Sequence, residues 1–429
     1  MRSFAVVAAM LLALPAHATL DISHKPTRNM DCSTPGECIA TDADAVMNTD
    51  QLAALLADGD MRVVTNGVIF QDMVIASPFS WAGSHALTLE SNDALFVRNA
   101  VTVQGTANLT LAVAGGPIFQ NKGALRFWDT ASRLTIDGQK YRLVGSIAEL
   151  AAAVAARPRA FLALARDYDA AQDGQYTRDP VLTTFAGTFD GLGNRIRNLS
   201  IWNMQDNNVG LFQATKGRAA IRNLGLVDVN VLAENSFVNF AGALVGYNGG
   251  TIENCSVDGG TVRTDFRGTL GGLAGLNYGR IYRAWTNVSV EGAQNAEVGG
   301  LIGNTHGHVE NVYALGRVIA GDQSDVGGLV GYSFGHVRLA YATGHVSGGQ
   351  NARVGGLMGT SQLPLHHTYW DVETSGTSFG VGGANVDGAT GMTTAELQAG
   401  LPRGFDPFVW TQDAAINGGL PYLLGNPPR

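Results

Sequence analysis

The stretch GGLIGNTHGHVENVYA begins at Gly299, and a close copy, GGLVGYSFGHVRLAYA, begins at Gly327. Three further versions of this phrase begin at Gly242, Gly271 and Gly355. The leucine of each copy recurs after 29, 28, 28 and 28 residues, at Leu244, Leu273, Leu301, Leu329 and Leu357. A fixed period of this length is the signature of a solenoid, in which each repeat stacks on the one before it.

Each copy holds short apolar pieces separated by turn residues, as in Val298–Gly303, His308–Ala314 and Arg317–Ile319. These pieces have strand length and are rich in β-branched and aromatic residues. A coil that stacks on itself at about 4.8 Å explains why the same residue type returns at the same phase. We therefore predict an all-β fold, a right-handed parallel β-helix with short capping and inserted helices, because crossovers between parallel strands are right-handed.

The period assigns residues to columns inside this tube. Beside the leucines we expect two further buried columns, formed by Ile281, Val309 and Val337 and by Val262, Val290, Val318 and Val346. A glycine series also keeps the period, and it predicts a recurring turn at which glycine tolerates positive φ. Its members are Gly250, Gly279, Gly307 and Gly335.

The repeats also carry a family resemblance. GGLVGYSFGHVRLAYATGHVSGG, residues Gly327–Gly349, resembles the GLUG repeat of filamentous-haemagglutinin-like bacterial surface proteins, which are adhesins. FAGTFDGLGNRIRNLSI, residues Phe185–Ile201, looks like the lead-in segment of that family, and Leu134–Leu150 looks like the linker before it. The resemblance implies an exported β-helix stem and an adhesin-like role.

The remaining chain divides around the repeats. Residues 1–18 have a short positive start, an apolar core and an Ala-His-Ala ending, which is typical of a secretory signal peptide. Capped helices are expected after Asn48, Ser146 and Thr393. We predict a signal peptide at 1–18, an N-terminal segment with a capping helix at 19–61, irregular coils at 62–140, a helical and loop insertion at 141–184, the GLUG-type β-helix at 185–375 and a C-terminal cap at 376–429.

Composition limits the classes of partner. Charged residues make up 15% of the chain and the net charge is −8, which argues against nucleic acid because phosphate binding needs a basic surface. After the signal, no apolar run reaches the roughly 20 residues of a membrane span. We expect the mature chain to be secreted, to be extracellular or at the cell surface, with the periplasm as an alternative, and to need no cofactor.

The cysteines fit export. Cys32 and Cys38 lie in a polar segment, so a small disulfide loop is expected, although the same pair could be two metal ligands. Two ligands do not make a zinc site. His308 and His336 should stack on adjacent coils, yet they lack a third ligand, so we predict no metal site. Cys255 falls at a position held by small apolar residues in later copies, which predicts burial.

One column could carry catalysis. Glu297 and Asp325 are 28 residues apart, and Arg353 continues the column. Two stacked carboxylates approach the roughly 5 Å separation of a retaining glycosidase, so a polysaccharide-degrading β-helix enzyme is the alternative function. The arginine can instead offset the two like charges in an exposed ladder. Structural use is the simpler interpretation, and we expect no enzyme.

A second column could bind a partner. Aromatic residues recur every 28 residues between small neighbours, at Trp285, Tyr313, Tyr341 and Tyr369. Simple alternation from Val309 would turn Tyr313 inward, so an outward direction needs a bend near Asn311. Exposed rings would form a stacking surface for a glycan or a surface protein; a ladder that only stabilises the stem is the alternative. We therefore predict a non-enzymatic, adhesin-like protein whose β-helix stem mediates adhesion or surface binding, with this column as its candidate binding site.

Overall fold

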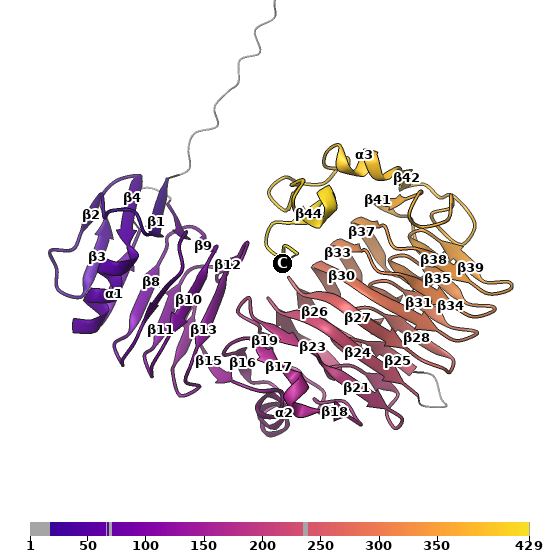
Figure 1. The fold of residues 1–429 in the computed structure, drawn as a ribbon, viewed down its shortest axis with the longest axis horizontal. Helices are drawn as coiled ribbons and strands as arrows, with labels where there is room; N and C mark the ends of the chain where they lie inside the picture. Colours follow the sequence, from indigo (N-terminus) through magenta and orange to yellow (C-terminus); the bar gives the residue numbers. More distant parts are fainter. Residues whose placement is uncertain (1–17, 66, 68–70, 235–238, 429) are drawn as a thin grey trace, which may run out of the picture.

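The computed structural model describes residues 18–65, 67, 71–234 and 239–428. Figure 1 shows two stacks of short parallel strands that meet near helix α2 and together form a curved body. The parallel β-helix predicted from the period is confirmed, because strands pair with their equivalents in the next coil in parallel register. The predicted signal peptide lies, except for Ala18, outside the described residues.

The N-terminal stack has three faces. One sheet contains β4 (Asp44–Asn48), β1 (Thr19–Ser23), β6 (Asp72–Ile75), β9 (Leu95–Val97) and β12 (Ile118–Phe119). A second contains β7 (Phe79–Trp81), β10 (Ala100–Val103) and β13 (Ala124–Phe127). The third follows the order β3 (Glu37–Ala40), β5 (Met61–Val64), β8 (Leu87–Glu90), β11 (Leu109–Ala112) and β14 (Leu134–Ile136).

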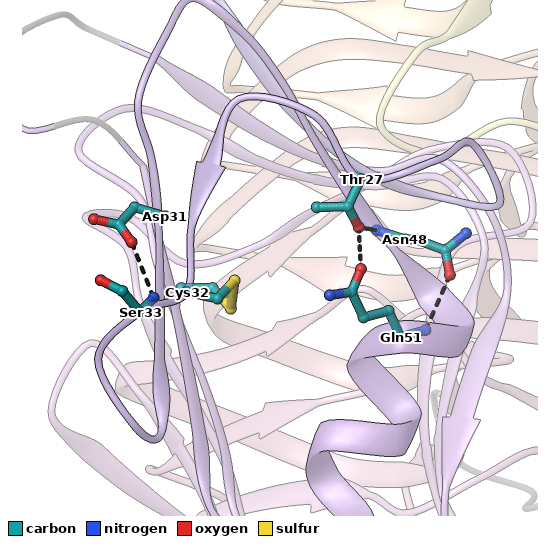
Figure 2. The surroundings of a disulfide bond; sticks show 7 residues. Thr27, Asp31, Cys32, Ser33, Asn48 and Gln51 are labelled. Atoms are coloured by element: carbon teal, nitrogen blue, oxygen red, sulfur yellow. Dashed lines mark hydrogen bonds between the residues drawn. A yellow bond between two sulfur atoms is a disulfide. The ribbon is translucent and has the colours of Figure 1, made fainter.

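Helix α1 (Thr49–Asp58) takes the place of a strand in the first coil and contacts β7, the edge of its sheet. Its buried side chains Leu52 and Leu56 join the N-terminal core, so the helix covers the open end of that core. The Asn48 side chain accepts hydrogen bonds from the backbone of Asp50 and Gln51 and caps the helix. Figure 2 shows the bond from Gln51.

A disulfide closes the loop between β2 (Met30–Asp31) and β3. Cys32 and Cys38 are bonded to each other, as the sequence predicted for an exported chain. Figure 2 shows the bond beside the Asp31 carboxylate, which accepts a 2.9 Å hydrogen bond from the Ser33 backbone. Cys255 is a free and fully buried thiol, as predicted.

The two stacks have separate apolar cores and meet at a change of strand direction. Strand β15 (Gln139–Val144) is antiparallel to β14 but parallel to β16 (Phe161–Leu164). Between them, α2 (Ile147–Ala156) buries its apolar side on the first coil of the second core, beside Leu162 and Leu164. The helix therefore closes one end of the C-terminal stack.

The predicted side insertion at 141–184 contains a coil of the stack. Besides β16, it holds β17 (Tyr168–Asp169), η1 (Ala170–Asp173) and β18 (Gln175–Tyr176). These strands pair in parallel with β19 (Thr188–Asp190), β20 (Arg195–Arg197) and β21 (Ser200–Asn203). The polar sequence after α2 hid this coil, since its strands are short and share no phase with the later repeats.

Two coils of the GLUG region have four strands instead of the three predicted pieces. The corner at Leu301 divides Val298–Gly303 into β31 (Glu297–Gly299) and β32 (Ile302–Thr305), which are followed by β33 (His308–Ala314) and β34 (Val318–Ala320). The next coil repeats them as β35 (Asp325–Gly327), β36 (Val330–Ser333), β37 (His336–Ala342) and β38 (Val346–Gly348). The last holds β39 (Arg353–Gly355), β40 (Met358–Ser361) and β41 (His366–Asp371).

In the coils before these, some neighbouring strands of one coil are continuous and form longer strands. These coils contain β22 (Asn208–Val209), β23 (Phe212–Arg222), β24 (Gly225–Ala233), β25 (Asn239–Gly242), β26 (Val245–Glu253), β27 (Ser256–Arg263), β28 (Gly268–Gly271), β29 (Ala274–Asn277) and β30 (Arg280–Gly292). All three predicted columns are buried in one core, including every repeat leucine from Leu244 to Leu357. These columns belong to one continuous core that extends from Val144 to Val381.

The glycine series is present for a different reason from the one predicted. Gly279 and Gly307 are absent from the positive-φ residues. A Cβ on Gly307 would instead lie 1.9 Å from the carbonyl oxygen of Gly279, and a Cβ on Gly279 would lie 1.9 Å from that of Gly250. Close backbone approach between stacked coils therefore requires glycine here.

The left-handed backbone positions lie elsewhere in each coil. One series of residues with φ near +50° recurs once per repeat, at Asn254, Arg283, Asn311, Leu339 and His367. At Asn311, with φ 53°, this conformation bends β33 so that Val309 and Val312 both face the core. The bend near Asn311 that an outward-facing Tyr313 required is thereby confirmed.

After β41 the chain first closes the end of the tube and then turns back along its side. The backbone of Leu357 donates to Gly380, and Val381 bridges to Met358, so the loop around Gly380 covers the last coil. The chain continues through β42 (Ala389–Met392), α3 (Thr394–Gln398), β43 (Trp410–Thr411), η2 (Asn417–Gly419) and β44 (Tyr422–Leu423), which Figure 1 shows folded beside the coils. Over the described residues, no helix is long and apolar enough to cross a membrane.

Candidate functional site

The predicted aromatic column forms and points away from the tube. Rings of Trp285 and Tyr313 stack with centroids 5.6 Å apart and planes within 5°, and Tyr313 stacks on Tyr341 at 5.1 Å and 7°. These rings belong to an apolar cluster separate from the core, whereas the neighbouring Val312 and Ala314 lie inside it. The outward direction is therefore confirmed. We call Trp285, Tyr313, Tyr341 and Tyr369 the covered column.

The prediction that these rings form an exposed surface is wrong. Trp285, Tyr313, Tyr341 and Tyr369 are 1%, 0%, 0% and 6% exposed, because the C-terminal segment lies over them. Trp410 packs against Tyr313 and Tyr341, and Phe405 packs edge-on against Tyr369. An aromatic row on an outer face does need a cover, and the same chain supplies it.

Hydrogen bonds fix this cover at several coils. Tyr341 donates its hydroxyl proton to the carbonyl of Pro421 at 2.6 Å, and burial raises its pKa well above the ordinary value for tyrosine. Trp285 donates from Nε1 to the carbonyl of Asn426 at 2.8 Å. The C-terminal segment therefore runs back along the covered column. Its aromatic residues cover a side of the stack, whereas the sequence predicts that they cover the end of the stack.

A second row of rings lies on a different face, and these rings are exposed. Tyr278 is 52% exposed and Phe334 is 45% exposed, and the exposed His306 lies between them. The ring centroids are 4.4 Å apart from Tyr278 to His306 and 4.7 Å from His306 to Phe334. Tyr247 and Tyr332, which are half-buried, extend the row at its two ends. We call these five residues the exposed column.

A buried polar ladder holds the exposed column in place. Directly before Tyr278, Asn277 points into the stack, donates to Thr305 at 2.9 Å and accepts from Asn248 at 2.7 Å. Directly after Tyr278 lies the glycine that permits close backbone approach. Tyr278, His306 and Phe334 are each fixed between a buried, hydrogen-bonded polar residue and one of these glycines, which gives successive coils the same ring position.

Sequence reasoning missed the exposed column although its signal was present. Tyr278, His306 and Phe334 follow one another at 28-residue intervals, in GLNYG, GNTHG and GYSFG. The glycines on either side suggested only a turn, and one member is a histidine, so the row did not stand out as aromatic. A residue immediately before a recurring glycine, at the outside of a turn, was the available signal.

The carboxylate column is in register but its charges are engaged. Glu297, Asp325 and Arg353 are Cα partners on successive coils. Arg353 makes a bidentate ion pair with Asp325, from Nε to Oδ1 at 2.5 Å and from Nη2 to Oδ2 at 2.6 Å. The Thr360 hydroxyl donates to Oδ1 of the same carboxylate at 2.7 Å. Glu297 accepts from Asn304 at 2.8 Å. Asp325 is 7% exposed, which leaves little of it for a substrate.

The histidines stack as the period predicted. Rings of His308 and His336 have centroids 5.2 Å apart. In the part of the chain that the structure describes, no group of three or more His, Cys, Asp or Glu side chains is placed to hold a metal ion.

Comparison with known proteins finds a family motif, a sequence relative and a solved structure that partly resemble this chain. The GLUG motif matches residues 241–263, which contain the first of the five copies. Halomucin from Haloquadratum walsbyi (strain DSM 16790 / HBSQ001) is 39% identical over 97 residues, which are 22% of this chain and 1% of halomucin. A putative immunoglobulin A1 protease from Bacteroides ovatus has a TM-score of 0.49 and 17% identity, over 67% of this chain and 93% of that chain.

The GLUG part of the expected resemblance is therefore shown. The four later copies lie in register with the matched one along the same buried columns. The likeness to filamentous haemagglutinin beyond the motif stays a prediction. The chain spans about 1% of the length of halomucin, so nothing about the whole of that protein transfers with the match.

Proposed function

We propose that this chain is a non-enzymatic, exported surface protein, adhesin-like in role, that binds a partner through the exposed column. The observation that carries the proposal is the stack of rings at Tyr278, His306 and Phe334, held at a repeated position and open to solvent. Aromatic rings offer a large contact area at low entropic cost, and a contiguous exposed patch is typical of a binding surface.

The partner would lie along the coils. Ring centroids 4.4 to 5.8 Å apart make a narrow strip one ring wide, which suits the flat face of a sugar chain or an apolar ridge on a surface protein. The polar ladder beneath the rings keeps the strip rigid, so little order is lost on binding. The GLUG repeat and the segment shared with halomucin, whose name describes a mucin, support a surface location.

The alternative is a polysaccharide-degrading enzyme built on Glu297 and Asp325. The engaged state of these carboxylates supports the non-enzymatic proposal, since a retaining glycosidase needs one free nucleophile and one proton donor. Incubation with bacterial, plant and host polysaccharides should release no reducing ends or unsaturated sugars. Release that is lost in Glu297→Gln or Asp325→Asn would overturn the proposal.

Binding is tested by removing the rings. Tyr278→Ala combined with Phe334→Ala should abolish attachment to cells or immobilised glycans while leaving the fold intact.

A further inference from the structure

A large groove lies where the two stacks meet. Its volume is about 1430 Å³, and it is bounded by β14 and β15, the end of α2, β16 and the turn at Lys216. This volume exceeds the roughly 300–1,000 Å³ of an ordinary small-molecule pocket, so a ligand of several linked units would fit. Phe161, which is 39% exposed, provides an apolar surface in its wall and packs edge-on against Tyr141.

The charges of this groove differ from those of the rest of the chain. Its lining contains six basic residues and no carboxylate: Arg133, Lys140, Arg142, Arg157, Arg159 and Lys216. All six are exposed, and none of them makes an ion pair with another described residue. The whole chain, by contrast, has 36 acidic and 28 basic residues. The groove therefore has a local excess of positive charge, although the protein as a whole is acidic.

Outside the groove, several arginines pair with a carboxylate on a neighbouring coil. Arg353 pairs with Asp325, Arg222 with Asp190 and Arg338 with Glu310. None of the six groove cations has such a partner among the described residues, although the sequence has 36 carboxylates. A solvated basic surface would not require the carboxylates to be kept out, whereas a site for an anion does, because a nearby carboxylate would repel the ligand.

The strand register brings like charges together. Leu134 pairs with Tyr141 in the antiparallel hairpin, which places Arg133 one residue before that pair and Arg142 one residue after it on the partner strand. Lys140 and Arg142 alternate with the buried Tyr141, so both face outward on the same side. Like charges at opposed positions destabilise a sheet unless something neutralises them. A bound anion would supply that neutralisation.

We infer that this groove binds an acidic oligosaccharide, a chain of sugars that carries carboxylate or sulfate groups. The guanidinium and ammonium groups pair with the anionic groups, and Phe161 packs against a sugar face. A bounded groove with an apolar wall favours this ligand over a nucleic acid, which would need an extended basic track along its phosphates. The site is separate in residues and chemistry from the exposed column.

The test is calorimetric titration of the full mature chain with a short oligogalacturonate, a neutral maltooligosaccharide of equal length and a single-stranded DNA. The oligogalacturonate alone should bind, and its affinity should fall as salt is raised from about 0.05 to 0.5 M, since added ions screen exposed charges. Arg133→Gln with Arg142→Gln should weaken binding at least tenfold. Arg263→Gln with Arg317→Gln, which makes the same charge change outside the groove, should not.

Other outcomes contradict the inference. Equal binding of the neutral sugar, preference for the DNA, absence of binding, or equal losses in the two double variants would each overturn it. If Arg133→Gln with Arg142→Gln does not fold, Lys140→Gln with Arg159→Gln gives the same readout. Tyr278→Ala with Phe334→Ala should bind the oligogalacturonate as the unmodified chain does, so a failure of the proposed adhesion function remains distinguishable from a failure of the groove.

Discussion

The indole Nε1 of Trp410 donates a 2.8 Å hydrogen bond to Oδ1 of Asn311, a residue 99 positions earlier in the chain. Asn311 is the residue whose left-handed backbone turns Tyr313 out of the tube. Asn311 therefore has two roles: its backbone turns Tyr313 outward, and its side chain accepts a hydrogen bond from Trp410 of the covering segment. The C-terminal segment is thus matched to the covered column and is a structural part of the stack.

Removing that cover should destabilise the C-terminal stack. Trp410→Ala deletes a fully buried indole that contacts Tyr313, Tyr341 and Phe405. The free energy of unfolding of the C-terminal stack should therefore fall by about 3–5 kcal/mol. Phe408→Ala is the matched control in the same segment, because Phe408 is 86% exposed and its loss should change stability by less than about 0.5 kcal/mol. Urea unfolding measures both; equal effects would contradict the covering role.

The glycine series should tolerate no side chain. Gly307→Ala places a Cβ 1.9 Å from the Gly279 carbonyl oxygen, so the coils must separate, at a cost of about 1–3 kcal/mol. Gly400→Ala is the control, since no atom lies within 4 Å of its Cβ position. Thermal unfolding that is equally affected by the two substitutions would show that close coil approach is not what requires glycine.

Asp179 should make stability depend on pH. Burial raises the pKa of this carboxyl from 3.8 to about 7, although Asn203 and the Gly210 backbone donate to it. The folded chain therefore holds this proton more tightly than the unfolded chain. The resulting stability is fully present below about pH 4 and is lost as pH rises through 7.

Asp179→Asn removes that titration with little change in shape. The difference in free energy of unfolding between the variant and the unmodified chain should grow in favour of the variant as pH rises from 4 to 8, by on the order of a few kcal/mol. Asp206→Asn is the control, because Arg178 lowers the pKa of Asp206 and the stabilising effect of Asp206 is lost only below about pH 4, so its difference from the unmodified chain should be constant over this range. Unfolding curves across this pH range would contradict the assignment if the Asp179→Asn difference were constant.

The repeat period predicted the parts of the fold that the period itself specifies. Leu301 and Val309 are buried because each stacks on its own equivalents, and a residue's phase is readable without any structure. Backbone conformation was less readable, since the left-handed position is occupied by Leu339 and Arg283 as well as by asparagine. Tertiary stacking imposes that conformation on residues that do not favour it.

The candidate site could be predicted only in part, for a related reason. The direction of Tyr313 followed from its small neighbours, but its burial depends on Trp410, which lies outside the repeats and shares no phase with them. No local pattern indicates which surface such a segment covers. The groove likewise brings Arg133 and Lys216 together at the place where the two apolar cores meet, and no pattern in the sequence shows where that place is.

The measurement that most directly tests the central claim compares binding with stability in one double variant. Tyr278→Ala with Phe334→Ala removes two exposed rings and no core contact, so Tm should stay within about 2 °C of the unmodified chain. Binding to intact cells and to an array of host and bacterial glycans should fall at least tenfold. Tyr341→Ala, which removes a covered ring, should lower Tm and leave binding to the folded chain intact. Unchanged binding by the double variant, or no binding by the unmodified chain to any of these surfaces, would contradict the account.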